Sequence, residues 1–103
     1  MRTYSLEFLK KAEREWNKLG ATIRAQFASK LAERLANPEV PKDKLRGYAH
    51  LYKIKLRNAG YRLIYEVDGD RVALVVIKIA ERDRGKAYDG LGDRLTEARR
   101  DRG

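Results

Sequence analysis

The sequence predicts an α+β fold in which an antiparallel β-sheet, made of an N-terminal strand and a three-stranded meander, carries a helical hairpin on one face. Three observations predict it: a short segment of alternating polarity, two segments of helical periodicity, and three β-rich segments joined by short turns. The chain has 103 residues, a length that suits one compact domain over residues 1–103.

The N-terminal third is expected to form one strand and two helices. Apolar residues alternate with polar ones over residues 3–8, which is typical of a half-buried strand. Residues 9–19 then carry an apolar stripe at helical spacing, formed by Leu9, Ala12, Trp16 and Leu19. A second helix is expected from about residue 21 to 36, and Asn37-Pro38 ends it because proline disfavours helical geometry in the preceding residue.

The rest of the chain is expected to form the meander and a short C-terminal helix. Strands are predicted at residues 52–57, 61–67 and 71–80, with Asp68-Gly69 as a tight turn between the last two. After residue 82, a weaker apolar stripe predicts a short helix; its members are Leu91, Leu95 and Ala98. We expect residues from about 96 to 103 to be a frayed basic tail.

Alternation within the meander places cations together on one face of the sheet. Tyr52, Ile54 and Leu56 must face the core, so the lysines between them lie on the opposite face. In the third strand Lys78 cannot easily lie inward, and the residues expected to face the core are Ala73, Val75, Ile77 and Ile79. The cationic surface then comprises Lys53, Lys55, Arg57, Arg62, Lys78 and Arg82, with Glu66 as its only acid.

The composition is strongly basic and excludes several kinds of site. Lysine and arginine number 24 against 15 acids, and seven of these cations but only one acid lie between residues 42 and 62. Such a patch attracts polyanions, although a solvated basic face without a partner has the same composition. Without cysteine, and with one histidine, the chain has no disulfide, thiolate site or two-histidine zinc site. No apolar run approaches the ~20 residues of a membrane span, and the N-terminus lacks a secretory signal, so we expect a cytoplasmic protein.

One reaction suits a site built from cations and tyrosines, namely cleavage of RNA by attack of a 2′-hydroxyl on the neighbouring phosphate. That step needs a base, positive charge around the phosphorane, and a proton for the 5′-oxygen. Arginine suits the phosphorane because its planar fork meets phosphate oxygens at two points. A lysine can be the base only if its pKa falls well below its ordinary value, and neighbouring cations push it in that direction.

Each candidate residue also has a plainer interpretation. Lys53 and Lys55 are candidate bases or two solvated strand lysines. Arg62 and Arg82 are candidate phosphate ligands or partners of nearby glutamates. Tyr88 either stacks on a base or packs under the C-terminal helix. We interpret His50 as a loop histidine without a role and Trp16 as a core residue.

Several motifs stand along most of the chain: Glu15-Trp16-Asn17-Lys18-Leu19-Gly20, Lys44-Leu45-Arg46-Gly47, Tyr52-Lys53-Ile54-Lys55-Leu56-Arg57, Gly60-Tyr61-Arg62-Leu63-Ile64-Tyr65, and Glu81-Arg82-Asp83-Arg84 followed by Tyr88. In this order and spacing they resemble the RelE family of bacterial toxins. The resemblance runs from about Tyr4 to Tyr88. Two departures are Glu81, where relatives often carry a basic residue, and a longer, more basic extension past Leu95.

The resemblance implies the toxin of a type II toxin–antitoxin pair. Such a toxin is a ribosome-dependent mRNA endonuclease that cuts the codon in the ribosomal A site by the 2′-hydroxyl route, without metal or another cofactor. It also implies contacts with ribosomal RNA and an acidic RelB-like antitoxin as partner. A ParE-like gyrase inhibitor and a non-catalytic RNA-binding or ribosome-binding module are the alternatives.

The resemblance also implies roles for individual residues. By position, Lys53 and Lys55 match the two active-site lysines, of which Lys55 is usually given the role of general base. Arg62 matches the arginine that stabilises the phosphorane, Arg82 the one that also protonates the leaving group, and Tyr88 the tyrosine that stacks on the nucleotide. The remaining cations expected to bind RNA are Lys44, Arg46, Arg57, Lys78 and Arg84.

Overall fold

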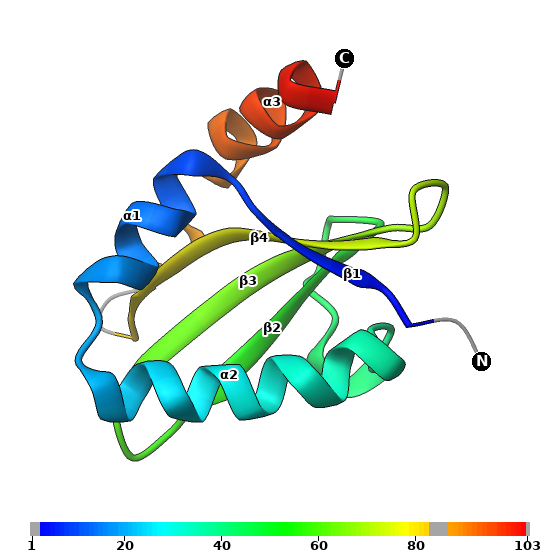
Figure 1. The fold of residues 1–103 in the computed structure, drawn as a ribbon. Coiled ribbons are helices and arrows are strands. Elements are labelled where there is room, and N and C mark those ends of the chain that lie inside the picture. The colour runs from blue at the N-terminus through cyan, green and yellow to red at the C-terminus, as the bar shows by residue number, and fades with distance from the viewer. Residues whose placement is uncertain (1–2, 83–86, 103) are drawn as a thin grey trace.

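Four strands form one mixed sheet in the order β1-β4-β3-β2 (Figure 1). The computed structural model describes residues 3–82 and 87–102. Strands β2 (Leu51–Leu56), β3 (Tyr61–Asp68) and β4 (Ala73–Glu81) form the expected antiparallel meander. The α+β class is therefore confirmed. In one detail the prediction is wrong, because β1 (Ser5–Phe8) runs parallel to β4; alternation identifies a strand but says nothing about its partner's direction.

Helices lie against the sheet at different strands. Helices α1 (Lys10–Lys18) and α2 (Ala21–Ala36) have nearly the bounds that their periodicity predicts, and α3 covers Leu91–Arg102. Helices α1 and α3 contact β4, whereas α2 contacts β2. A short 3₁₀ helix, η1 (Pro41–Asp43), lies between α2 and β2. None of the helices in the described part of the chain is long and apolar enough to cross a bilayer.

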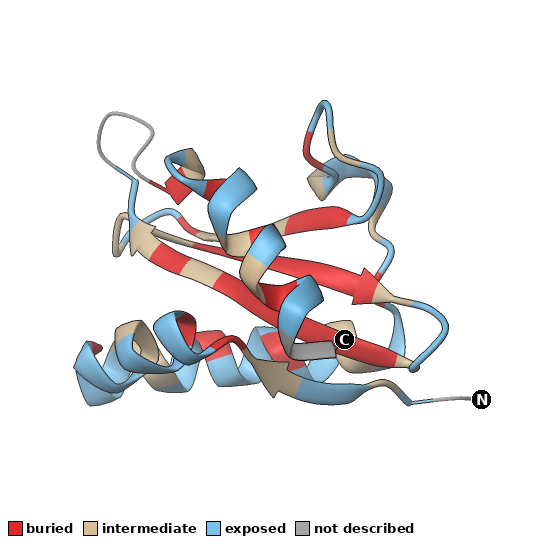
Figure 2. Cartoon of the chain, turned by 90° about the horizontal axis from the view of Figure 1, so that it is seen from above, coloured by how far each residue is buried: buried red, intermediate tan, exposed pale blue. Residues whose placement is uncertain are grey.

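Buried residues are concentrated in the strands, and exposed residues cover the outer sides of the helices (Figure 2). Phe27 and Leu31 of α2 are fully buried, as the stripe at every fourth residue predicts. Trp16 is partly buried rather than central to the core, and its ring meets Phe8 edge to face at 5.3 Å. The helical hairpin and the sheet therefore share one apolar layer.

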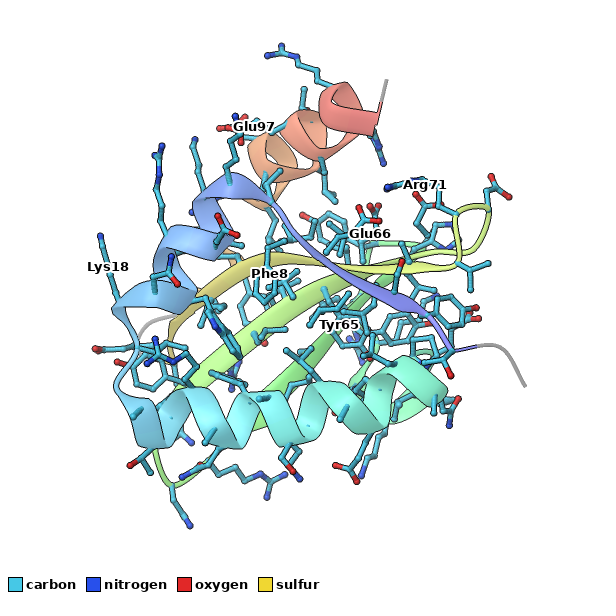
Figure 3. The ribbon with its side chains drawn as sticks, viewed as in Figure 1. Phe8, Lys18, Tyr65, Glu66, Arg71 and Glu97 are labelled. Atoms are coloured by element: carbon cyan, nitrogen blue, oxygen red, sulfur yellow. The ribbon has the colours of Figure 1, made fainter. Side chains whose placement is uncertain are left out.

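A polar network beneath the sheet attaches α2 and the segment after it to β2 and β3. Arg34 donates to Asp43 Oδ2 at 2.6 Å, to the Tyr65 hydroxyl at 2.9 Å and to the backbone oxygen of Lys53 at 3.4 Å. Tyr65 in turn donates to the backbone oxygen of Pro38 at 2.6 Å. Tyr65 lies toward α2, whereas its neighbour Glu66 lies on the other side of the strand (Figure 3). Through the bond to its backbone oxygen, the network holds the backbone of Lys53 in place.

A β-bulge in β4 changes which of its side chains share the face of Lys53. Ile64 pairs with Lys78 but Tyr65 pairs with Val76, so Ile77 is an extra residue. Beyond it, Ala73 and Val75 pair with Asp68 and Glu66 and lie on the face that carries Lys53. Both are buried in the core as expected, but the prediction that they lie on the face opposite the cations is wrong. A continuous apolar run has no alternation from which such a shift can be detected.

Two chain segments also differ from expectation. The turn between β3 and β4 spans residues 69–72, and its left-handed residue is Val72, with φ of 51°, rather than Gly69. The residues expected to form a frayed tail continue α3 to Arg102, and Ala98 is buried. An ion pair of 3.0 Å between Lys11 and Glu97 also connects this part of α3 to α1.

Candidate active site

The register of β2 against β3 brings the two lysines to Arg62. Lys55 pairs directly with Arg62, and Lys53 pairs with Ile64 two residues along β3. Paired residues on neighbouring strands point to the same side of a sheet, so the three cations share one face. All three are half-buried. The structure thus brings Lys53 and Lys55 of β2 close to Arg62 of β3.

Crowding of these cations lowers the pKa of Lys55 below its ordinary value. The largest cause is repulsion by the charge of Lys53, followed by partial desolvation and by the charges of Arg62 and Arg57. Each neighbouring positive charge disfavours the protonated amine. The geometry therefore favours Lys55 as the residue that can hold a neutral, basic amine.

Tyr88 is fixed against Arg62. Arg62 donates to the Tyr88 hydroxyl at 2.5 Å, and its guanidinium carbon lies 5.5 Å from the centre of the Tyr88 ring. Arg62 Nε is buried without a hydrogen-bond partner among the residues that the structure describes. Tyr88 is half-buried and packs against the core just before α3 begins.

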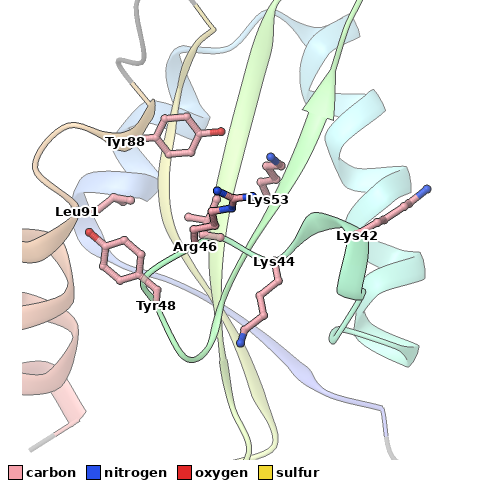
Figure 4. Close-up of a pocket in the computed structure, with 8 residues that line it drawn as sticks. Lys42, Lys44, Arg46, Tyr48, Lys53, Tyr88 and Leu91 are labelled. Carbon is pink, nitrogen blue, oxygen red and sulfur yellow. The ribbon is translucent and has the colours of Figure 1, made fainter.

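A cleft of about 500 Å³ opens beside this cluster (Figure 4). It is lined by Lys42, Lys44, Leu45, Arg46, Tyr48, Lys53, Tyr88 and Leu91. Tyr48, Leu91 and Tyr88 stand along one side, with Arg46 and Lys53 near the centre (Figure 4). A cleft with aromatic walls and cations suits a nucleotide, because its base can stack while its phosphate is neutralised.

Tyr48 and Leu91 are cleft residues that the sequence analysis did not assign to the site. Tyr48 follows Gly47, whose φ of 81° turns the chain between η1 and β2. In the sequence, its place directly after the Lys44-Leu45-Arg46-Gly47 motif is the signal that could have suggested it. Leu91 carries no such signal, because the apolar stripe of the C-terminal helix already accounts for a leucine at this position.

Arg82 and Arg57 lie at a second cleft, of about 490 Å³, at the end of β4. The turn residues 58–61 and Glu81 complete its lining. The backbone nitrogen of Arg82 donates to the oxygen of Gly60 at 2.6 Å, which attaches this end of β4 to the β2–β3 turn. Arg62 pairs with Ala80 of β4, and Arg82 lies two residues further along the chain. Its side chain is exposed. The structure therefore places Arg82 at this second cleft, next to the β2–β3 turn.

The other predicted RNA-binding residues have separate positions. Lys44 and Arg46 line the first cleft, whereas Arg84 lies outside the described residues. Lys78 is on the cationic face as predicted, but its ammonium donates to the backbone oxygen of Asp89 at 2.5 Å. His50 is exposed at a different cleft, beside the β3–β4 turn.

Comparison with known proteins identifies the family. A family model described as the ParE toxin of the type II toxin–antitoxin system parDE matches residues 6–85. Over 92 residues, 89% of this chain and 97% of the relative, the sequence is 46% identical to the mRNA interferase toxin RelE of Escherichia coli K12. The chain belongs to the RelE/ParE toxin family.

Solved structures agree with this membership. The free state of an E. coli RelE toxin with two arginines replaced by alanine superposes with a TM-score of 0.83 and 41% identity, over 90% of this chain and 98% of that one. The toxin in the intact E. coli RelBE toxin–antitoxin complex gives a TM-score of 0.76 at 46% identity, over 79% of this chain and 99% of that one. The fold is RelE-like.

Proposed function

We propose that this protein, a RelE-type mRNA interferase toxin of a type II toxin–antitoxin system, cleaves mRNA in the ribosomal A site. Its identity to the E. coli interferase over most of both chains supports the toxin class. The observation that carries the chemistry is the position of Lys55 between Lys53 and Arg62. The charge of Lys53, and to a smaller extent that of Arg62, lowers the pKa of Lys55. The substrate is translated in the cytoplasm, and the protein acts there.

The reaction is a transfer within the RNA that needs no metal. Lys55 takes the proton of the 2′-hydroxyl, whose oxygen attacks the adjacent phosphorus, and the bond from phosphorus to the 5′-oxygen breaks. Arg62 and Lys53 stabilise the phosphorane, while Arg82 reaches it from the end of β4 and supplies the proton that the 5′-oxygen gains. Tyr88 stacks on a base next to the scissile phosphate, and Lys44, Arg46 and Arg57 bind neighbouring phosphates.

The ribosome and the antitoxin are the macromolecular partners. The cleft is open, so the protein alone does little to align a 2′-hydroxyl with the scissile bond, and the ribosome supplies this alignment. An acidic RelB-like antitoxin fits the same basic face by charge. The E. coli RelBE complex supports this partner, because its toxin resembles this chain in sequence and fold.

Mapping the 5′ ends of a reporter transcript after induction tests the function. We expect cuts inside in-frame codons with the unchanged protein, and a loss of cleavage by about two or more orders of magnitude for Arg82→Ala while ribosome binding persists. Purified protein should leave ribosome-free mRNA intact at moderate salt.

Other outcomes contradict the proposal in different ways. A non-catalytic module would lose only about one salt-dependent phosphate contact in Arg82→Ala and would cut nothing. A ParE-like toxin would change DNA supercoiling and leave mRNA whole. Efficient cleavage of ribosome-free mRNA would overturn the dependence on the ribosome.

A further inference from the structure

We infer that Lys78 is a positioning residue that holds Tyr88 in the active site. The residue after Tyr88 is Asp89, and its backbone oxygen accepts a hydrogen bond of 2.5 Å from Lys78 Nζ. Tyr88 itself meets Arg62 through its hydroxyl. The inference rests on the proposed function, because it assigns Lys78 a role in that same site.

The bulge in β4 places Lys78 where it can make this contact. After the extra residue Ile77, Lys78 pairs with Ile64 and shares the face of Lys53 and Arg62. The backbone groups on both sides of Lys78 are held as well: Arg94 donates to the oxygen of Ile77, and the nitrogen of Ile79 donates to Glu15. The backbone at Lys78 is therefore held in place on both sides by side-chain hydrogen bonds.

The segment that carries Tyr88 is exposed immediately after the tyrosine. Ala87 and Leu91 are buried on either side of it, while Asp89 and Gly90 are exposed. Gly90 has φ of 69°, a backbone region in which glycine has unusual freedom. The bond from Lys78 is charge-assisted and lies next to Tyr88 in the chain, so it limits how far the ring can move from Arg62.

This role differs from that of an RNA ligand, although both use a positive charge on the same face. A phosphate ligand contributes to affinity and to its salt dependence whatever stands at position 88. A positioning residue acts through Tyr88 alone, so its removal has no further effect once the tyrosine is gone. The two roles are separated by a double-mutant cycle.

The cycle uses Lys78→Met, Tyr88→Ala and the double variant, with single-turnover cleavage on ribosomes programmed with mRNA. We expect Lys78→Met to lower the rate constant about tenfold with ribosome affinity unchanged, and to have no effect in the Tyr88→Ala background. Lys78→Arg, which keeps a long cationic donor, should restore most of the rate. Lys30→Met on the exposed side of α2 controls for the loss of one charge. Equal losses in both backgrounds would overturn the inference.

Nuclear magnetic resonance tests the same inference without any cleavage. In Lys78→Met the Tyr88 ring signals should shift and the amides of Asp89 and Gly90 should exchange faster, while the Tyr52 ring signals stay unchanged. Unchanged Tyr88 signals would overturn the inference even if the protein cuts mRNA. If the unchanged protein cuts no mRNA, the proposed function fails, and these spectra alone decide whether Lys78 holds Tyr88.

Discussion

Lys55 can lose its proton more readily because of its neighbours, which lower its pKa. An isolated lysine is almost fully protonated at neutral pH, and a buried apolar setting is one way to change that. Here the largest cause is instead the positive charge of Lys53, with Arg62 and Arg57 contributing further. A lysine pair on one strand, facing an arginine on the next, therefore lowers the pKa of one lysine, with partial desolvation as a further cause.

Replacing Lys53 with Gln should raise the pKa of Lys55, because the largest opposing charge is removed. The acid side of the pH–rate profile for single-turnover cleavage should then move to higher pH. The rate should fall most at neutral pH and recover partly as the pH rises. Arg57→Gln is the matched control, since its charge contributes less, and its profile should move less. An unmoved profile in Lys53→Gln would argue against Lys55 as the base.

Among the elements, β4 and the two helices beside it are joined by a partly buried ion pair. Glu15 of α1 and Arg94 of α3 make two contacts of 2.9 Å, and both side chains are largely buried. The same pair satisfies backbone groups next to the bulge, with Arg94 on the oxygen of Ile77 and Glu15 on the nitrogen of Ile79, each at 3.0 Å. Helix α3 is therefore attached more firmly than its weak apolar stripe predicts.

Arg94→Met should reduce the free energy of unfolding by about 2 kcal/mol, because it leaves Glu15 without its charge partner and the Ile77 oxygen without a donor. Urea denaturation measures this difference. Lys11→Met removes the other ion pair between α1 and α3, which is much more exposed, and should change stability little. Similar losses of unfolding free energy in both variants would show that burial does not decide how much these ion pairs stabilise the fold.

For the molecule as a whole, the two faces of the sheet differ in charge. The face against α2 is largely apolar and carries the Arg34 network, in which the cation is paired with Asp43. The opposite face carries the lysine cluster and the cleft that holds Arg46 and Lys44. An excess of positive charge on one surface attracts RNA and orients its approach.

Arg46→Gln should weaken ribosome binding and reduce the slope of log affinity against log salt by about one, as expected for one lost phosphate contact. The cleavage rate of the bound complex should change far less than in Arg82→Ala. Lys30→Gln on α2 carries the same change of charge outside the cleft and should leave the slope nearly unaltered. A slope unchanged in Arg46→Gln would remove Arg46 from the set of phosphate ligands.

The element order and the cationic face could be predicted from the sequence because both depend on local patterns. The bounds of α2, for example, follow from an apolar residue at every fourth position and a closing proline. The position of Tyr88 could not be predicted in this way. It depends on the hydrogen bond with Arg62, which lies 26 residues earlier, and local patterns do not determine such a contact.

By itself, the sequence determined the α+β class, the basic character of one sheet face and the motifs shared with RelE toxins. Only the tertiary structure decided that β1 runs parallel to β4, that a bulge shifts Ala73 and Val75 to the cationic face, and that Lys78 binds a backbone oxygen near Tyr88. The physical reason is the range of the interactions. Periodicity records which side of its own element a residue occupies, whereas strand direction, register and the partner of a charged group depend on segments distant in the chain.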